Sequence, residues 1–269
     1  MSITKQELLS EMRDFQNNSG FAGGIPKLEE LLSNYKKGSH TTTPGLPSFF
    51  IKSTTETAYQ RAIFSDTYSD LVLSTGDELH VEWLDLEVPL TFSKKARRPS
   101  ADLIGECGNS YAIGELKYCK NTSSMRPEYA IFEVLMYNWF IDDNVTDLHK
   151  HDVSHEGKNI HWDNFFAESQ YLIVGANKRY WDYWLKTRGN EKFSYRKITS
   201  ENEQGVDGKL SNSQNISNLI SYLNNKYSVK IMCFETPDCD FEKQRGDSDK
   251  YEPKLIKEFR WEQLFVNDD

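Results

Sequence analysis

The 269-residue sequence has few cysteines and no long apolar run. Its four cysteines, Cys107, Cys119, Cys233 and Cys239, show no CxxC spacing, which argues against a structural zinc site and makes reduced thiols the expectation. No apolar run approaches the roughly 18 residues that a membrane-spanning helix needs, and the N-terminus lacks the apolar segment of a secretory signal. We therefore expect a soluble, cytoplasmic protein with no membrane partner.

Basic residues are fewer than acidic ones: 32 Lys and Arg against 41 Asp and Glu give a formal net charge of −9. This balance is unfavourable for a nucleic-acid-binding protein, whose affinity comes largely from neutralising phosphates. Two local basic groups could still attract a polyanion, although each residue could equally be an ordinary solvated side chain. They comprise Lys94, Lys95, Arg97 and Arg98, and then Lys178, Arg179, Lys186 and Arg188.

Hydrophobic residues make up 38% of the chain and aromatic residues 13%, which excludes a wholly disordered protein.

Two amphipathic helices are predicted near the start, one over residues 3–16 opened by a capping box and one beginning at Pro26. A loop rich in Gly, Ser, Thr and Pro follows them. We predict an N-terminal helical extension over residues 1–50 and a single folded domain over residues 51–269.

The stretch over residues 98–120 carries the clearest local pattern. Two apolar runs flank Gly108-Asn109, a dipeptide typical of a two-residue hairpin turn of type II′. With the turn placed there, Asp102 faces Glu115 across two antiparallel strands, on one face of the sheet. Lys117 lies two residues beyond Glu115 and shares that face. The hairpin therefore predicts two carboxylates and an ammonium group on one small patch.

Opposed like charges destabilise a sheet unless something offsets them. A hard divalent cation would do so, and Mg²⁺ typically binds one or two protein carboxylates together with water and substrate phosphate oxygens. A protonated Lys117 could hold an attacking water or stabilise charge on a phosphoryl group. The pattern favours metal-assisted phosphodiester hydrolysis. The alternative for the same three residues is a solvated polar face with a weak ion pair.

Asp102, followed by Glu115-Leu116-Lys117 at the end of an apolar strand, resembles the PD-(D/E)xK motif of the restriction-endonuclease-like nuclease superfamily. The resemblance covers residues 54–176, with Pro99 three positions before Asp102 instead of adjoining it. It implies an α/β fold with an αβββαβ core, in which helices flank a mixed sheet. It also implies a Mg²⁺- or Mn²⁺-dependent hydrolase, a DNA endonuclease suited to restriction or antiviral defence.

The metal ligands that the resemblance implies are oxygen donors: Asp102, Glu115 and the backbone carbonyl of Leu116. An additional ligand is implied from the first core helix, where Glu56 stands at the expected place. The alternative for Glu56 is a capping-box bond back to its own helix start. Glu87, near the end of a predicted strand over residues 79–90, is a second candidate; its alternative is a polar residue at a strand end.

A helix is predicted to start at Pro127, apolar around most of its circumference and therefore buried. Glu133 and Tyr137 lie four residues apart on one face of it. They resemble the QxxxY element that follows the motif, with Glu in place of Gln, which implies support for Lys117 or contact with phosphate. The alternative is an acid that reaches solvent beside a core tyrosine.

Further along, residues 170–176 predict a strand covered on both faces, residues 213–227 a helix, and residues 229–234 the last strand.

An aromatic run over residues 180–184 could stack nucleic-acid bases, but its helical spacing is typical of core packing. Four histidines lie in a polar segment, which favours a solvated loop over a metal site. They are His149, His151, His155 and His161.

The alternative hypothesis is that the protein is not an enzyme but a nuclease-like binding module, which docks a protein partner. An RNA-directed nuclease differs from the first reading only in substrate. Cutting both strands of a duplex requires two active sites, which a homodimer would supply.

Overall fold

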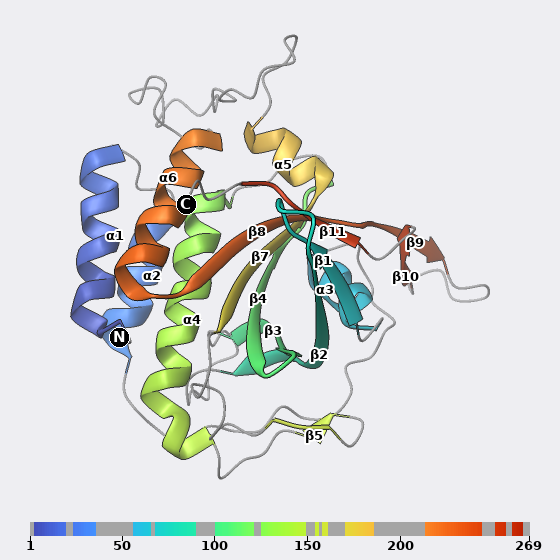
Figure 1. Ribbon diagram of the computed structural model, residues 1–269, viewed down its shortest axis with the longest axis horizontal. Coiled ribbons are helices and arrows are strands. Elements are labelled where there is room, and N and C mark those ends of the chain that lie inside the picture. Colours follow the sequence, from blue (N-terminus) through green and yellow to red (C-terminus); the bar gives the residue numbers. More distant parts are fainter. Residues whose placement is uncertain are drawn as a thin grey trace.

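The computed structural model (Figure 1) describes part of the chain. The described ranges are residues 3–19, 24–35, 56–65, 68–89, 100–120, 125–148, 154–155, 158–160, 170–185, 213–243, 251–256 and 260–265. Within these ranges a large mixed sheet lies beside a layer of helices, and both contribute to the core (Figure 1).

Seven strands form a closed barrel in the order β1-β11-β8-β7-β4-β3-β2. Their bounds are β1 Tyr68–Val72, β2 Glu78–Pro89, β3 Ser100–Cys107, β4 Ser110–Lys117, β7 Tyr171–Asn177, β8 Lys230–Thr236 and β11 Arg260–Gln263. The β4, β7 and β8 strands run parallel to one another. The β1 strand closes the barrel by pairing parallel with β11 and antiparallel with β2.

The predicted open αβββαβ sheet is therefore wrong. Sequence analysis missed β1 and β11, and these two strands join the edges of the sheet: β11 pairs parallel with β1 and antiparallel with β8. Each is short, five residues for β1 and four for β11, so few positions can show a period-two pattern. Their buried members, Leu71 and Trp261, supply the apolar contacts inside the barrel.

Apolar side chains from all seven strands and from α3 (Glu56–Ser65) fill the barrel. Trp83 and Trp261 lie in this interior with ring centroids 5.8 Å apart. A glycine, Gly175 on β7, leaves room for Trp261 and Leu116. A Cβ atom at that position would lie 2.8 Å from Leu116 and 2.9 Å from Trp261. The interior is thus packed without space for one added methyl group at this point.

Gly175→Ala should therefore lower the free energy of unfolding by about 1–3 kcal/mol, the usual cost of overpacking a well-filled core. Urea unfolding followed by circular dichroism measures the change. Gly114→Ala on the neighbouring strand is the matched control, because its added Cβ would meet its nearest neighbours at 3.1–3.5 Å and should cost less. Equal unfolding midpoints for the two variants would contradict the packing described here.

Helices cover the outer face of the sheet. They are α1 (Lys5–Ser19), α2 (Ile25–Asn34), α4 (Pro127–Leu148), α5 (Lys178–Leu185) and α6 (Ser213–Tyr227). The predicted burial of α4 is confirmed: it contacts β3, β4 and β7 on one side and α1, α2 and α6 on the other. The predicted capping box of α1 is also confirmed, since the Thr4 amide donates to Glu7 and the Glu7 amide donates back to Thr4 Oγ1.

The β2 strand, predicted over residues 79–90, does not alternate regularly along its length. A bulge between Trp83 and Asp85 shifts its register against β3. After the bulge Leu86, not Asp85, enters the barrel interior beside Trp83. Glu87 then has a positive φ of 53°. Val81 and Trp83 therefore share the interior face of β2, and Asp85 does not continue it.

The remaining described strands form two small sheets. They are β5 (Ser154–His155) with β6 (Lys158–Asn159), and β9 (Asp238–Lys243) with β10 (Tyr251–Ile256). Together with β11, the β9–β10 pair shows that residues 229–234 do not form the last strand. All four cysteines are buried as reduced thiols. Among the helices that the structure describes, none is long and apolar enough to cross a membrane.

Candidate active site

The β3–β4 hairpin has the predicted register. Cys107 pairs with Ser110, and each pair down to Leu103 with Gly114 follows the same alignment. Gly108 has a positive φ of 61° and Asn109 does not, as a type II′ turn requires. The turn dipeptide therefore sets which side chains of the two strands meet.

The three motif side chains leave the hairpin on one face. Leu103 and Leu116 point into the barrel, so their strand neighbours Asp102, Glu115 and Lys117 point the other way, toward the helical layer. All three are buried, with 9%, 2% and 4% of their surfaces exposed. Asp102 also accepts a hydrogen bond of 2.7 Å from the Leu116 amide. The alternative of a solvated polar face is inconsistent with this burial.

Lys117 is held between two carboxylates. Its ammonium donates to Glu115 Oε1 and, over 3.0 Å, to Glu133 Oε2 of α4. The Tyr129 hydroxyl donates to the other oxygen of Glu133 over 3.4 Å, and the Lys117 ammonium lies 5.8 Å from the centre of the Tyr129 ring. Sequence analysis missed Tyr129, although it precedes Glu133 by the same four residues that separate Glu133 from Tyr137.

Glu56, on α3, extends toward the cluster of Asp102, Glu115 and Lys117; the apolar residues of this helix pack against the barrel strands. Its carboxylate accepts a 3.0 Å hydrogen bond from the Tyr118 amide, directly after Lys117. Its charge acts on both Asp102 and Lys117. The capping partner considered for it, Ser53, lies outside the described residues. The structure thus brings Glu56 to the end of β4, beside the motif residues.

Burial dominates the electrostatics of this site. Desolvation raises the pKa of Asp102 to about 8 against the pull of Lys117. Desolvation, and then the charges of Asp102 and Glu133, raise the pKa of Glu115 well above its usual range. Burial alone would lower the pKa of Lys117, but Glu115 and Glu133 lead the surrounding carboxylates in raising it. The lysine is therefore protonated, whereas burial opposes the ionisation of Asp102 and Glu115 unless a further cation offsets their charge.

One oxygen of the cluster is left without a donor. Glu115 Oε2 is buried and has no hydrogen-bond partner among the described residues, while Oε1 accepts from Lys117. An orphaned buried carboxylate oxygen is costly unless a cation or a donor meets it. In the described part of the chain, no three His, Cys, Asp or Glu side chains converge into a metal site of their own. The donors available to a metal are thus two carboxylates and backbone or solvent oxygens.

Comparisons with known proteins give no relative. No family model, curated protein or solved structure matches the chain. What the site can do follows from its own residues.

Glu87 does not join the cluster as Glu56 does. Its side chain is 40% exposed, and its carboxylate lies 4.0 Å from Arg61 of α3. Glu87 lies opposite Asp102 in the sheet, because the flanking pairs are Leu86 with Leu103 and Val88 with Ala101. The positive φ of Glu87, however, takes its backbone out of regular strand geometry. Of the two candidates for an additional ligand, the geometry favours Glu56.

Lys178 and Arg179 start α5 directly after β7, whose Ala176 pairs with Lys117. They therefore lie at the same sheet edge as the cluster. Both are exposed and paired: Lys178 with Asp182 at 3.1 Å, and Arg179 with Asp238 at 3.6 Å. The other basic candidates, Lys94, Lys95, Arg97, Arg98, Lys186 and Arg188, lie outside the described residues.

Asn177, at the end of β7, is a second residue that was not predicted, and its side chain holds the neighbouring segments in place. The Asn177 side chain accepts from the Cys119 amide and donates to the Cys119 carbonyl, both over 3.0 Å. It also donates to Asp238, the partner of Arg179. An Asn at the end of a buried strand was the available signal. These bonds fix the segment after Lys117 to the start of α5.

The aromatic run of α5 packs in the core. Tyr180, Trp181 and Trp184 are buried, and the Trp181 indole donates to backbone carbonyls of β7 and β8. These three rings are not available to stack bases. Of the four histidines, His155 lies in β5 and the other three are outside the described residues.

Proposed function

We propose that this protein is a Mg²⁺- or Mn²⁺-dependent nuclease that hydrolyses phosphodiester bonds in DNA. The observation that supports it best is the buried cluster of Asp102, Glu115 and Lys117, with Glu115 Oε2 left without a donor. A protein core rarely retains two carboxylates whose ionisation burial opposes, and such groups concentrate at functional sites. The proposal rests on these side chains and not on the fold, whose closed barrel differs from the fold that the motif implied.

The metal would be held by Asp102 and Glu115 with the Leu116 carbonyl. Glu56 would become a further ligand only if its side chain moved closer, because no three acids of the described residues are placed to share a metal. These are hard oxygen donors, and two carboxylates with solvent and phosphate oxygens are a usual set for Mg²⁺. A cation would satisfy the Glu115 oxygen that no donor of the described residues meets. When bound, the metal supplies Lewis-acid stabilisation of charge on the phosphodiester.

Lys117 supplies the fixed positive charge of the site. Its carboxylate neighbours hold it protonated and hold its ammonium in place. A pre-positioned cation of this kind can orient an attacking water and stabilise the negative charge that develops on the phosphoryl oxygens. Glu133, fixed by Tyr129, positions this lysine from α4.

Lys178 and Arg179 would meet the phosphate backbone of the substrate at the edge of the sheet where β4 and β7 end. Contacts of this kind position a nucleic acid without reading its sequence. Endonucleolytic cleavage in restriction or antiviral defence, with a homodimer to cut both strands, is the biological role that suits the motif. RNA remains the alternative substrate.

Calorimetric titration with Mn²⁺ tests the proposal. We expect the protein to bind Mn²⁺ at millimolar concentration or below, and Glu115→Gln to remove that binding while the fold is kept. Glu106→Gln is the matched control, since Glu106 lies four residues from Asp102 on the same strand and should leave binding unchanged. Absence of Mn²⁺ binding at millimolar concentration would contradict the metal-dependent mechanism and favour the protein-docking module.

A further inference from the structure

Tyr180 of α5 is buried and carries an unused hydroxyl group. None of its surface is exposed, and its hydroxyl has no hydrogen-bond partner among the described residues. The buried hydroxyl of Tyr227, by contrast, donates to Glu11. A buried hydroxyl without a partner is costly, and a catalytic role is one of the reasons for which proteins keep such groups.

The start of α5 places this hydroxyl on the side of the Asp102–Glu115–Lys117 cluster. Tyr180 is the third residue of α5, which begins directly after β7. Ala176, near the end of β7, pairs with Lys117. Tyr180 packs in the core between the sheet and the helices, on the same face of the sheet as the three motif side chains. Helical side chains point back toward the start of their helix, so its ring is directed toward these strand ends.

The electrostatics of Tyr180 agree with this position. Burial raises the pKa of its hydroxyl well above the usual range, and the positive charge of Lys117 opposes that rise. The charges of Glu128 and Glu56 also act on the hydroxyl. It therefore keeps its proton at neutral pH, and it can serve as a hydrogen-bond donor but not as a base.

The helix holds the ring in a fixed position. The Trp181 indole donates to the carbonyls of Ala176 and Phe234 over 3.1 and 3.0 Å. The rings of Tyr180 and Trp181 meet edge to face, with centroids 5.1 Å apart. A donor fixed in advance where negative charge develops stabilises a transition state, because it need not reorganise during the reaction.

We propose that Tyr180 is a catalytic residue of the nuclease, and that its hydroxyl donates to a non-bridging oxygen of the scissile phosphodiester. This inference rests on the proposed function. Lys117 donates two of its three N–H groups to Glu115 and Glu133, which leaves one for the substrate. A phosphodiester carries two non-bridging oxygens, and the hydroxyl serves the one that Lys117 does not reach.

Tyr180→Phe tests the inference because it removes one oxygen atom and keeps the ring. With a DNA oligonucleotide in Mn²⁺, we expect kcat to fall about 100-fold, the usual loss for one transition-state donor. KM and the calorimetric affinity for Mn²⁺ should stay unchanged, since neither depends on this donor. The urea unfolding midpoint should stay at the wild-type value or rise, because the hydroxyl that is removed had no bond to lose.

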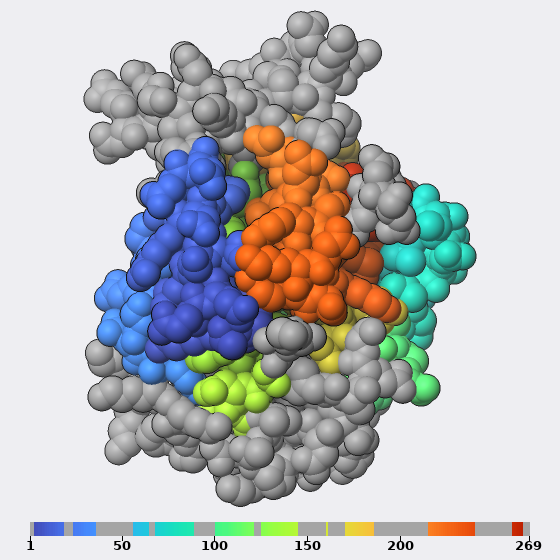
Figure 2. Space-filling view, turned by 60° about the vertical axis from the view of Figure 1, so that its left-hand side comes forward, coloured from blue at the N-terminus to red at the C-terminus, as the bar shows by residue number. Residues whose placement is uncertain are grey.

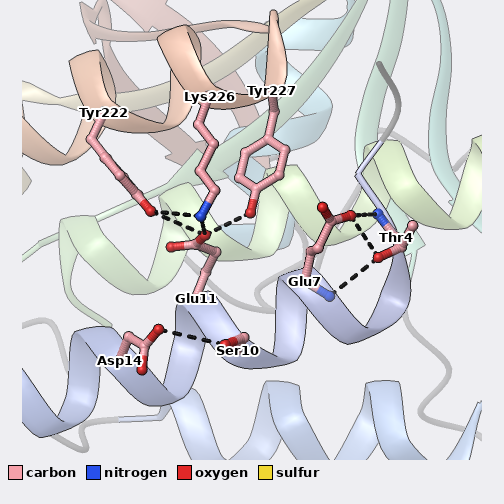
Figure 3. Close-up of polar contacts among 8 residues, drawn as sticks. All are labelled: Thr4, Glu7, Ser10, Glu11, Asp14, Tyr222, Lys226 and Tyr227. Atoms are coloured by element: carbon pink, nitrogen blue, oxygen red, sulfur yellow. Dashed lines mark hydrogen bonds and ion pairs between the residues drawn. The ribbon is translucent and has the colours of Figure 1, made fainter.

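Tyr227→Phe is the matched control. Tyr227 is 5% exposed, but its hydroxyl donates to Glu11 of α1 over 2.6 Å (Figure 3). It belongs to α6, whose surface lies beside that of α1 on the face shown in Figure 2. This variant should give the opposite pair of results: a lower unfolding midpoint, because Glu11 loses a donor, and the kcat of wild type.

Combining Tyr180→Phe with Lys117→Met gives a readout that a structural role of Tyr180 would not move. Two donors that stabilise the same developing charge act as a unit, so the combined loss of kcat should be smaller than the product of the two single losses. Losses that multiply would place Tyr180 outside the group of residues that acts on the phosphodiester.

The inference is overturned if Tyr180→Phe keeps the wild-type kcat, if it unfolds at a clearly lower urea concentration than wild type, or if the losses in the double variant multiply. With a wild type that cleaves DNA, each of these results leaves the nuclease proposal intact. A wild type that cleaves no DNA in Mn²⁺ overturns both.

Discussion

Replacing Lys117 with methionine is expected to lower the rate of metal-dependent DNA cleavage by about 100- to 1,000-fold, the usual loss when one fixed charge or donor is removed from a transition state. Methionine has nearly the length of the lysine stem, so the apolar contacts of the stem are largely kept. The charge that would stabilise the phosphoryl oxygens is lost. Cleavage of a plasmid in Mn²⁺, followed over time, measures the rate.

Lys120→Met is the matched control, because Lys120 lies three residues further along and is exposed. It should cleave at the wild-type rate. Thermal unfolding followed by circular dichroism shows whether each variant is folded. A folded Lys117→Met protein that cleaves at the wild-type rate would exclude Lys117 from the chemistry.

Variants of the two carboxylates, Asp102 and Glu115, should lose a different function from the Lys117 variant. Asp102→Ala and Glu115→Ala are each expected to abolish cleavage and also Mn²⁺ binding, while Lys117→Met should keep Mn²⁺ binding and lose cleavage. This division separates residues that hold the metal from the residue that acts on the phosphodiester. Full cleavage by Glu115→Ala would refute the assignment of the active site.

The local part of this site could be predicted from sequence because a short-range signal fixed it. The Gly108-Asn109 turn sets the register of two adjacent strands, and a register sets the face of every side chain in them. Asp102, Glu115 and Lys117 therefore came together in the prediction as they do in the structure.

The closure of the barrel could not be predicted in the same way. It depends on β1 pairing with β11, two strands separated by almost the whole domain and each too short to show a clear alternation. The single buried ring of β11, Trp261, looks the same in sequence whether it lies inside a barrel or in a loop. Only the contacts with Trp83 and Phe234 distinguish the two.

The choice between Glu56 and Glu87 was open for a related reason. Both are single acids at the end of a predicted element, and neither has a local pattern that tells where the carboxylate points. The Glu56 carboxylate is directed by the packing of α3 against the barrel. The direction of the Glu87 side chain depends on a bulge and on a positive φ, and neither can be predicted from the residues around it.

Asp102→Asn is expected to stabilise the metal-free protein at neutral and alkaline pH. Burial raises the pKa of Asp102 to about 8 from an ordinary value of 3.8. Below pH 3.8 the carboxyl is protonated in both the folded and unfolded chains and costs nothing. As the pH rises from about 4 to about 8, the unfolded chain ionises first, so the free energy of unfolding falls. Asparagine does not titrate, and it can still accept the hydrogen bond from the Leu116 amide.

The gain should be on the order of a few kcal/mol near pH 8 and should vanish near pH 4, since each unit of pKa difference corresponds to about 1.4 kcal/mol. Urea unfolding at a series of pH values measures it, with Glu30→Gln as the control for removing one exposed acid. Lys117 stays paired with Glu115 and Glu133 in the variant, so the substitution leaves no isolated ammonium group.

Mn²⁺ should reverse the order of stability. At about one hundred times its dissociation constant, a ligand that binds only the folded state stabilises it by about 2.7 kcal/mol. Wild type should gain this amount and Asp102→Asn should not, because the variant loses the carboxylate that would hold the metal. If Asp102→Asn instead destabilises the metal-free protein at pH 8, the buried carboxylate contributes to the fold. The site would then have no need of a cation to offset its charge.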